Sequence, residues 1–402
     1  MIRRRHFLSG SAAAAATLAA PALVRAQATP IKVGEINSYS TAPAFTVPYR
    51  NGIALALEQL NAGGGLLGRP VEVIHRDDAG RPEDAVRHAG ELVNNERVDL
   101  LAGTYLSNIG LAVSDFARQN RKLFLASEPL TDAVVWAQGH RYCYRLRPST
   151  YMQAAMLAEE AVRLPAKKWA TVAPNYEYGQ SSVANFKKLI KAATPEAEFV
   201  AEQFPALGKI DAGATISALE NAKPDGIFNV LFGADLTVFV REGNTRGLFE
   251  KRTVASMLTG EPEYIIPLGE ETPEGWIVTG YPWEQITEPA HKAFIAAYRA
   301  KWNDAPRLGS VLGYVVGYMM KDLLDKAGST ETEKMLAALR GGSFKTILGP
   351  ILMRASDQQS TMGAWVGETS KQGKVGTMKN WRYEDGANYM FSEAEVKAAR
   401  KD

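Results

Sequence analysis

Short apolar runs rich in β-forming residues recur along the chain and predict buried strands. Each run is almost continuously apolar, which is typical of strands covered on both faces of a parallel sheet. Seven runs of this kind lie at 31–36, 71–76, 98–103, 122–127, 169–174, 226–232 and 275–280. Because longer segments of a different period separate them, the pattern indicates repeated strand–helix–strand units.

The segments between the strands repeat apolar residues every three or four positions, as one face of a helix does. In 49–61, for example, Ile53, Leu57 and Leu60 follow this spacing. The same spacing predicts helices over 83–94, 107–119, 150–163, 178–191, 212–222 and 235–246. Two series of units, one before about residue 148 and one after it, predict two α/β lobes.

The last third of the chain has a different pattern. Three predicted helices follow one another directly, and they are followed by two weak strand regions. These segments are 288–301, 309–327 and 331–340 for the helices, and around 343–353 and 375–383 for the strands.

Residues 1–28 have the pattern of an export signal. Three arginines at 3–5 precede an Ala-rich apolar run over 10–24, and Ala26 and Ala28 offer two cleavage sites. The arginines resemble those of a twin-arginine signal, and an ordinary secretory signal is the alternative. Either signal predicts that the mature protein leaves the cytoplasm, and we expect it in the periplasm of a Gram-negative bacterium.

Charge and cysteine content exclude several classes of partner. The whole chain has 46 basic and 44 acidic residues, and the signal contains four arginines and no acid. The mature chain therefore has 42 basic against 44 acidic residues, a net charge of −2, which gives no support for a nucleic-acid or lipid surface. The single cysteine, Cys143, can form no internal disulfide, and no apolar run reaches the roughly 18 residues of a membrane span.

The stretch "NAGGGLLGRP" over 61–70 matches the G-x-G-x-x-G spacing of a dinucleotide-binding turn. That turn must follow a strand and open a helix, so that the pyrophosphate meets the helix N-terminus. Here a predicted helix precedes the glycines and Pro70 opens a strand. We therefore expect a helix end with a left-handed cap at Asn61 and Gly63, and no dinucleotide.

Other catalytic and metal-binding motifs are also missing. The sequence has no phosphate-binding loop and no nucleophile elbow, and the histidines at 75, 88, 140 and 291 lack the spacing of metal ligands. We therefore predict no cofactor, no metal and no catalytic residue.

Short motifs follow one another in register from about residue 31 to at least residue 350. They include "NGIALALEQLNAGGGLLGRPVEVIHRDDAG", "VDLLAGTYLSNIG", "YRLRPS", "YEYGQS", "KPDGIFNVLFGADLTVF" and "ETPEGWIVTG". This series resembles the periplasmic substrate-binding proteins of the branched-chain amino acid class, the soluble receptors of ABC importers. The resemblance implies a type I binding-protein fold, with two doubly wound parallel-sheet lobes, a three-crossing hinge and a ligand cleft between the lobes.

The implied hinge divides each lobe into two segments of the chain. We expect the crossings near 148–150, near 280 and near 353. The predicted units are residues 29–149 plus 281–353 for one lobe, 150–280 plus 354–390 for the other, and 391–402 for a C-terminal tail.

Hydroxyl residues follow two neighbouring predicted strands. Ser107 is placed to cap the helix after 98–103, and Thr131 of "SEPLTD" is placed to cap the next short helix. Hydroxyls beside the free N–H groups of a helix N-terminus suit a carboxylate. The resemblance implies that these positions hold the α-carboxylate of an amino acid, and plain capping is the alternative. Ser127 and Glu128 of the same segment are also candidate ligand-binding residues.

Aromatic residues are expected to close the cleft. Tyr178 of "YEYG" matches a family tyrosine that lies against the ligand, and Phe232 stands where a tyrosine is common. Phe45 and Tyr105 are candidates from the first lobe. The alternative for each is a place in the core.

The ammonium group of an amino acid needs an acid or several carbonyl groups. The resemblance implies a glutamate after the strand matching 253–257, for which Glu261 is nearest, although the local spacing is shorter than in the family. Asp235 is the substitute candidate. This departure leaves an aromatic or 2-oxo carboxylate open as a ligand, as well as an amide or urea.

The sequence therefore predicts a periplasmic, non-enzymatic and monomeric receptor. It is expected to bind a small carboxylate-bearing solute, a neutral amino acid in the first instance, and to deliver it to membrane permease subunits of an ABC importer. A ligand-sensing receptor and a periplasmic enzyme are the alternatives from other classes.

Overall fold

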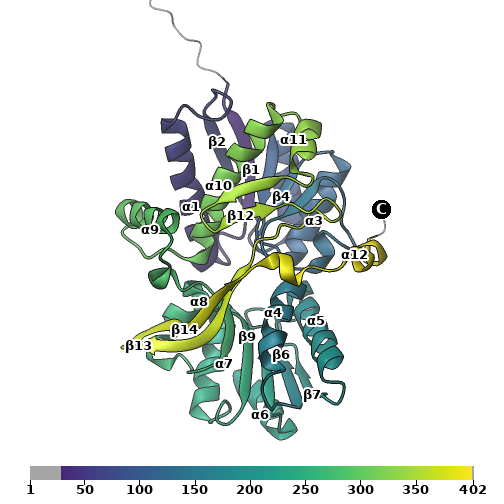
Figure 1. Ribbon diagram of the computed structural model, residues 1–402, viewed down its shortest axis with the longest axis vertical. Helices are drawn as coiled ribbons and strands as arrows, with labels where there is room; N and C mark the ends of the chain where they lie inside the picture. The colour runs from purple at the N-terminus through teal and green to yellow at the C-terminus, as the bar shows by residue number, and fades with distance from the viewer. Residues whose placement is uncertain (1–28, 401–402) are drawn as a thin grey trace, which may run out of the picture.

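The computed structural model describes residues 29–400 and shows two α/β lobes, one above the other in Figure 1. The first lobe is built on a five-stranded sheet of order β2-β1-β3-β4-β5, in which all neighbours are parallel. Its strands are β1 (Ile31–Asn37), β2 (Val71–Asp77), β3 (Leu100–Gly103), β4 (Phe124–Ala126) and β5 (Cys143–Arg145).

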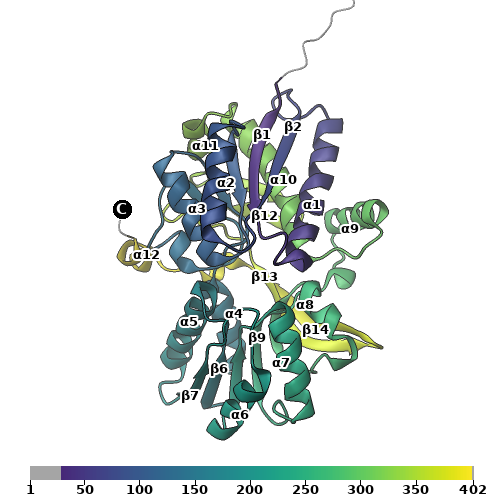
Figure 2. The ribbon, with the colours of Figure 1, turned by 180° about the vertical axis from the view of Figure 1, so that it is seen from behind.

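Helices cover both faces of this sheet. One face carries α2 and α3, as Figure 2 shows, and the other carries α1, α10 and α11. The elements that complete the lobe are α1 (Pro43–Ala62), α2 (Pro82–Asn94), α3 (Ser107–Gln119), η1 (Asp132–Val134), η3 (Trp283–Gln285), α9 (Pro289–Trp302), α10 (Leu308–Ala327), α11 (Thr332–Leu339) and the hairpin of β11 (Ser343–Thr346) and β12 (Gly349–Leu352).

The second lobe is built on a seven-stranded sheet of order β14-β13-β10-β9-β8-β6-β7. Its central strands are parallel, whereas β13 and β14 add an antiparallel pair at one edge. The strands are β6 (Lys168–Val172), β7 (Glu198–Gln203), β8 (Gly226–Asn229), β9 (Thr253–Gly260), β10 (Ile277–Gly280), β13 (Ala364–Gln372) and β14 (Val375–Glu384). The helices are α4 (Thr150–Ala161), α5 (Glu177–Ala193), α6 (Ala212–Ala222), α7 (Gly233–Thr245), α8 (Pro262–Leu268), η2 (Gly269–Glu271) and η4 (Gly386–Tyr389). The expected fold class, two doubly wound parallel-sheet lobes, is confirmed.

The chain passes between the lobes three times. It leaves the first sheet after β5, leaves the second sheet after β10, and returns to the second sheet at β13. We expected the third crossing near residue 353, but the backbone N–H of Ser360 donates to the carbonyl oxygen of Arg145 at 3.0 Å. Residues 358–360 therefore extend the edge of the first sheet, and the crossing follows Ser360.

The glycine-rich turn ends α1 and leads into β2. We expected a left-handed cap at Asn61 and Gly63, but Gly63 has φ −81° and the left-handed residues are Gly64 (φ 100°) and Gly65 (φ 78°). A Cβ at Gly65 would lie 2.0 Å from the carbonyl oxygen of Arg69, so only glycine fits there. The helix therefore precedes the glycines and a strand follows them, the reverse of a dinucleotide-binding turn.

The C-terminal segment is more than the tail that we expected from residue 391. It contains α12 (Glu393–Ala399), whose Val396 is 2% exposed within the first-lobe core. Phe391 stacks on Trp136 of the first lobe, with ring centroids 3.7 Å apart, and meets Tyr151 of α4 edge-on at 4.2 Å. This aromatic cluster therefore links the two lobes beside the hinge.

Phe391→Ala is expected to lower the free energy of unfolding by about 1–3 kcal/mol, because it removes apolar area and two ring–ring contacts. Urea unfolding followed by circular dichroism measures the change. Val375→Ala is the matched control, since Val375 is 50% exposed and should change stability by less than about 0.5 kcal/mol. Equal effects of the two substitutions would contradict a linking role for Phe391.

Candidate functional site

A cavity of about 440 Å³ lies between the lobes, where loops after strands of both sheets meet. We call it the inter-lobe cavity. Its aromatic lining comes from Phe45 and Tyr105 of the first lobe and from Phe232 and Tyr264 of the second. Parallel sheets bind ligands at the carboxyl ends of their strands, so this position is the one that the fold favours.

The aromatic rings form a continuous wall across the cavity. Tyr105 lies 5.1 Å from Phe45 and 6.1 Å from Phe232, measured between ring centroids. The hydroxyl groups of Tyr105 and Tyr264 are 2.7 Å apart and form a hydrogen bond between the lobes. An apolar or aromatic group of a solute can pack against this wall at offset or edge-to-face geometry.

Three helices begin at the inter-lobe cavity. Their N-cap residues are Ala42 of α1, Leu106 of α3 and Phe232 of α7, and all three line the cavity. No N-cap side chain accepts a hydrogen bond from the first turn of these helices, which leaves first-turn N–H groups available at their positive ends. In α1 this applies to Ala44 only, because Pro43 has no N–H and the N–H of Phe45 donates to the carbonyl oxygen of Ala42 at 3.2 Å. The arrangement favours a carboxylate without requiring a basic side chain.

Ser107 and Thr131 meet at adjacent strand ends, although not as two caps. We expected Ser107 to cap α3, but it is the first helical residue, and its Oγ accepts a hydrogen bond from the N–H of Thr131 at 3.2 Å. Thr131 caps η1 as expected, and its hydroxyl donates to Oε1 of Glu177 on α5 at 2.6 Å. The Ser107 side chain therefore links two segments of the first lobe, and the Thr131 side chain links the two lobes. Neither side chain lines the inter-lobe cavity.

The two candidate acids already have partners inside the protein. Asp235 lines the cavity, but its carboxylate accepts hydrogen bonds from the N–H groups of Gly208 at 2.7 Å and Ile210 at 3.4 Å. Glu261 is 1% exposed and forms an ion pair with Arg147, which is also buried. Burial raises the pKa of Glu261 to about 8, against the opposing effect of Arg147.

Three more candidates are buried beside the cavity. Tyr178 is 2% exposed and packs edge-on against Phe232 with centroids 5.7 Å apart, and its hydroxyl has no partner among residues 29–400. The hydroxyl of Ser127 lies 3.0 Å from that of Tyr49. Glu128 is 1% exposed, and neither of its carboxylate oxygens has a partner within the same residues.

The structure thus brings Phe45, Tyr105, Phe232 and Asp235 to the lining and places the other six candidates behind or beside it. Sequence reasoning missed Tyr264 and Arg147. The guanidinium of Arg147 lies 5.5 Å from the ring centroid of Phe45, behind the aromatic wall. Arg147 lies in the motif "YRLRPS", and Tyr264 lies in the segment after β9. Neither segment has a periodic pattern that would distinguish these residues as functional.

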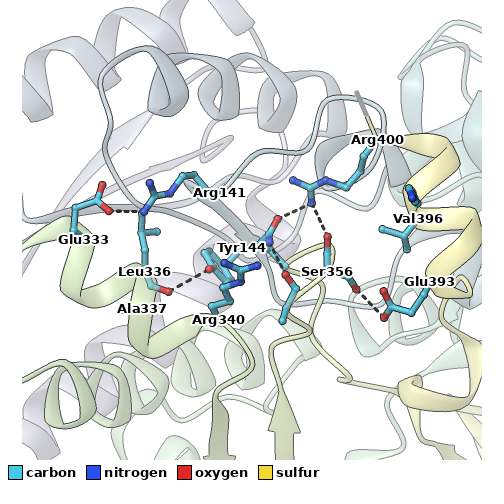
Figure 3. Close-up of a pocket in the computed structure, with 13 residues that line it drawn as sticks. Arg141, Tyr144, Glu333, Leu336, Ala337, Arg340, Ser356, Glu393, Val396 and Arg400 are labelled. Carbon is cyan, nitrogen blue, oxygen red and sulfur yellow. Dashed lines mark hydrogen bonds and ion pairs between the residues drawn. The ribbon is translucent and has the colours of Figure 1, made fainter. Parts of the chain in front are cut away.

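A larger hollow lies elsewhere, between the first lobe and α12 (Figure 3). It has a volume of about 1020 Å³ and a lining of mixed charge, in which Arg141 pairs with Glu333 and Ser356 with Glu393. Its lining contains no residue of the second sheet or its helices. Closure of the two lobes therefore cannot enclose a solute there.

A sequence profile for a family described as "Periplasmic binding protein" matches residues 30–374. The chain belongs to the periplasmic binding protein family. The resemblance that the motifs indicated is thereby confirmed.

Relatives of this periplasmic binding protein include a Leucine-, isoleucine-, valine-, threonine-, and alanine-binding protein of Pseudomonas aeruginosa. The two are 27% identical over 304 residues, which cover 75% of this chain and 79% of the relative. A Leu/Ile/Val-binding protein homolog 4 of Brucella abortus is 23% identical, over 95% of this chain and 92% of its own length.

Solved structures show the same fold. A periplasmic binding protein from Burkholderia mallei superposes with a TM-score of 0.82 at 18% identity, covering 93% of this chain and 99% of its own. A solute binding protein of an ABC transporter from Rhodopseudomonas palustris, in complex with 3,4-dihydroxy benzoic acid, has a TM-score of 0.79 at 23% identity, covering 89% and 98%.

Two further findings concern the described part of the chain. Over residues 29–400, no three or more His, Cys, Asp and Glu side chains gather in a way that could hold a metal ion. No helix within these limits combines the length and the apolar character that crossing a membrane requires. The predicted export signal lies outside the described residues.

Proposed function

We propose that this periplasmic binding protein is the solute-binding component of an ABC importer. It captures a small carboxylate-bearing solute in the inter-lobe cavity and presents it to the permease in the membrane. The observation that carries the proposal is the meeting of three uncapped helix N-termini, from both lobes, at one cavity with an aromatic wall.

The two-lobe architecture supplies the mechanism. A solute that contacts both lobes gains contacts only when the lobes are closed, so binding shifts the open–closed population toward the closed form. The permease then recognises the closed shape. In this role the protein acts in the periplasm as a monomer, without a cofactor, and returns its ligand chemically unchanged.

A neutral amino acid is the first candidate ligand. The curated relatives are named for leucine, isoleucine, valine, threonine and alanine, and the helix N-termini suit an α-carboxylate. An aromatic carboxylate is the second candidate, because four aromatic side chains line the cavity and structural neighbours hold 3,4-dihydroxy benzoic acid and 4-hydroxybenzoate.

A thermal-shift screen of the mature protein tests the function. The panel contains leucine, valine and phenylalanine together with benzoate, 4-hydroxybenzoate, phenylpyruvate and urea. A true ligand stabilises the protein by RT ln(1 + [L]/Kd), so the midpoint should rise with concentration. Recovery of unchanged ligand after binding separates a receptor from an enzyme, and mass spectrometry of co-purified small molecules extends the panel. A protein that binds no small carboxylate would contradict the proposal.

Phe232→Ala is expected to weaken the affinity for the ligand about 10- to 100-fold, because it removes the central ring of the aromatic wall. Titration calorimetry measures the change. Val238→Ala on the same helix is the matched control, since Val238 is 45% exposed and should leave the affinity unchanged. An unchanged affinity of Phe232→Ala would place the ligand away from this wall.

A further inference from the structure

The segment between β7 and α6 forms part of the wall of the inter-lobe cavity. We call residues 204–210 the β7 loop. Its residues Leu207 and Gly208 line the cavity, and the same lining includes Pro43 and Ala44 of α1 from the first lobe. The β7 loop is therefore a third contribution of the second lobe to the cavity, besides the N-terminus of α7 and Tyr264 of α8.

The backbone of the β7 loop has a defined shape. Phe204 and Ile210, at its two ends, pack against the core of the second lobe. Between them, the N–H of Lys209 donates to the carbonyl oxygen of Ala206 at 3.0 Å and closes a tight turn, in which Gly208 takes a left-handed conformation with φ 74°. Anchored ends and a closed turn fix the tip of the loop at the cavity.

Asp235 of α7 holds this tip from the side. Its carboxylate accepts hydrogen bonds from the N–H groups of Gly208 at 2.7 Å and Ile210 at 3.4 Å, and the residue is 5% exposed. Hydrogen bonds to an ionised carboxylate are stronger than those between neutral groups. A further bond runs from the N–H of Asn175, after β6, to the carbonyl oxygen of Pro205 at 2.8 Å. Asp235 thus lines the cavity but uses both oxygens on the β7 loop.

Leu207, at the tip of the turn, differs from the other apolar residues of the β7 loop. Phe204 and Ile210 pack against the second-lobe core, whereas Leu207 belongs to none of the hydrophobic clusters formed by residues 29–400. It is 37% exposed although it lines the cavity. A fixed turn therefore presents an apolar side chain that still has area for a solute to cover.

Beyond the helix N-termini, the cavity lining offers few polar groups. Asp235 is the only charged side chain among the residues of the described chain that line it, and its oxygens are taken by the β7 loop. The hydroxyl groups of Tyr105 and Tyr264 bind each other. The part of a solute that extends from its carboxylate therefore meets mostly apolar surface, which can select it by size and shape.

We propose that Leu207 sets the size of the apolar group that the inter-lobe cavity accepts, and that Asp235 is the positioning residue that holds Leu207 in place. This inference rests on the proposed function and narrows it to carboxylates with an apolar group. The carboxylate lies at the helix N-termini, and the apolar group ends against Leu207. Since one methylene in an apolar pocket changes discrimination about 10- to 200-fold, a single leucine at this place is enough to set a size limit.

Two series of carboxylates of increasing length test the role of Leu207 by titration calorimetry. One runs from L-alanine through 2-aminobutyrate and norvaline to norleucine, and the other from benzoate through phenylacetate to 3-phenylpropanoate. The readout is the ratio of the affinities of the longest and the shortest members that bind. Leu207→Ala enlarges the cavity and should raise this ratio about 5- to 10-fold, whereas Leu207→Phe should lower it by a similar factor.

Leu164→Ala is the matched control for Leu207→Ala. Leu164 lies before β6, is 40% exposed, and is not part of the cavity lining. The ratio should therefore stay unchanged in this variant. An unchanged ratio in both Leu207→Ala and Leu207→Phe would overturn the inference.

A double-mutant cycle tests the positioning role of Asp235. Asp235→Ala releases the tip of the β7 loop, so the affinity ratio should rise as it does in Leu207→Ala. Adding Leu207→Ala to Asp235→Ala should then change the ratio by less than about twofold, because the two residues act as one unit. A merely structural role would weaken long and short members equally and would leave the effect of Leu207→Ala intact.

Asp211→Ala is the matched control for Asp235→Ala. Asp211 directly follows the β7 loop, and its side chain accepts the N–H of Ala214 as the N-cap of α6. Its substitution should lower stability without changing the affinity ratio. Should Asp235→Ala fail to fold, Asp235→Asn takes its place in the cycle, because it keeps the shape of the side chain and loses one acceptor oxygen.

The outcomes separate this inference from the proposed function. A full effect of Leu207→Ala in the Asp235→Ala background would overturn the positioning role, and unchanged ratios in the Leu207 variants would overturn the size limit. Either result still shows that the protein binds a carboxylate and leaves the receptor function in place. Binding of no member of either series would contradict the proposed function itself.

Discussion

Gly313→Ala should lower the free energy of unfolding by about 3–5 kcal/mol, because α1 and α10 pack with their backbones in contact. A Cβ at Gly313 would lie 2.0 Å from the carbonyl oxygen of Tyr49 on α1. A Cβ at Gly52 or at Gly309 would also meet a backbone oxygen of the opposite helix, at 2.0 and 2.4 Å. Because backbone atoms meet the added methyl, the helices must separate rather than a side chain rotate.

Gly90→Ala on α2 is the matched control. The nearest atom to a Cβ at Gly90 lies 4.0 Å away, on Phe116, so the substitution adds no clash. Alanine in a helix interior is favoured over glycine, and the control should keep or raise stability by up to about 1 kcal/mol. Urea unfolding followed by circular dichroism measures both variants, and equal midpoints would show that the α1–α10 contact is less tight than the structure indicates.

The effect of Gly313→Ala should reach the binding site as well. The N-terminus of α1 lines the inter-lobe cavity through Ala42 and Phe45, and the carbonyl oxygen of Phe45 is the atom nearest to Gly309. Separation of α1 from α10 therefore moves the aromatic wall. A weaker affinity in the folded fraction of Gly313→Ala is the expected result by calorimetry.

Arg145→Met should lower the free energy of unfolding by about 3–5 kcal/mol, because it removes a charged donor from a buried hydrogen-bond network and leaves buried acceptors unpaired. Arg145 is fully buried, and its guanidinium donates to the carbonyl oxygens of Leu130 and Thr131 and to Oε1 of Gln359. Burial lowers its pKa to about 10, so the group is still charged at neutral pH. Its loss leaves two buried acceptors, the carbonyl oxygen of Thr131 and Oε1 of Gln359, without a donor, whereas the carbonyl oxygen of Leu130 keeps the N–H of Thr150 at 2.8 Å.

The Arg145 network connects the third crossing with the loop that carries Glu128 and Thr131. Arg145→Met should therefore also weaken ligand affinity, which a merely local destabilisation would not do. Arg141→Met is the matched control, because Arg141 and its partner Glu333 are both exposed and the change should stay below about 0.5 kcal/mol. If Arg141→Met lost as much stability as Arg145→Met, the buried hydrogen bonds of Arg145 would not be the cause of the loss.

Three strands that the sequence did not predict, β5, β7 and β13, lack a continuous apolar run. β7 lies at the edge of its sheet and is mostly half-buried or exposed, so it lacks the continuous apolar run of a central strand. β5 has only three residues and ends in the buried Arg145, and β13 mixes glycine and polar residues in an antiparallel edge pair. Most central parallel strands are covered on both faces and are therefore visible as apolar runs. Two strands depart from this rule: the edge strand β2 was predicted from its apolar run, and the central strand β9 was expected only from the resemblance.

The sequence also predicted only part of the candidate site. Phe45, Tyr105, Phe232 and Asp235 reach the cavity because they follow strand ends or begin helices, which is a local property. Arg147 and Tyr264 owe their places to the hinge and to contacts across the lobes. Such contacts join residues more than 100 positions apart, and no periodic pattern encodes them.

By itself the sequence determined the two α/β lobes, the order of most of their central strands and helices, and the membership of the family. Apolar periodicity and the order of motifs are properties of the sequence alone and need no knowledge of long-range contacts. Only the tertiary structure decided that Glu261 is taken by Arg147, that Ser107 joins a loop instead of capping a helix, and that Glu128 keeps its carboxylate unused. The physical reason is that the partner of a buried charge depends on which groups exclude water around it, and folding alone brings those groups together.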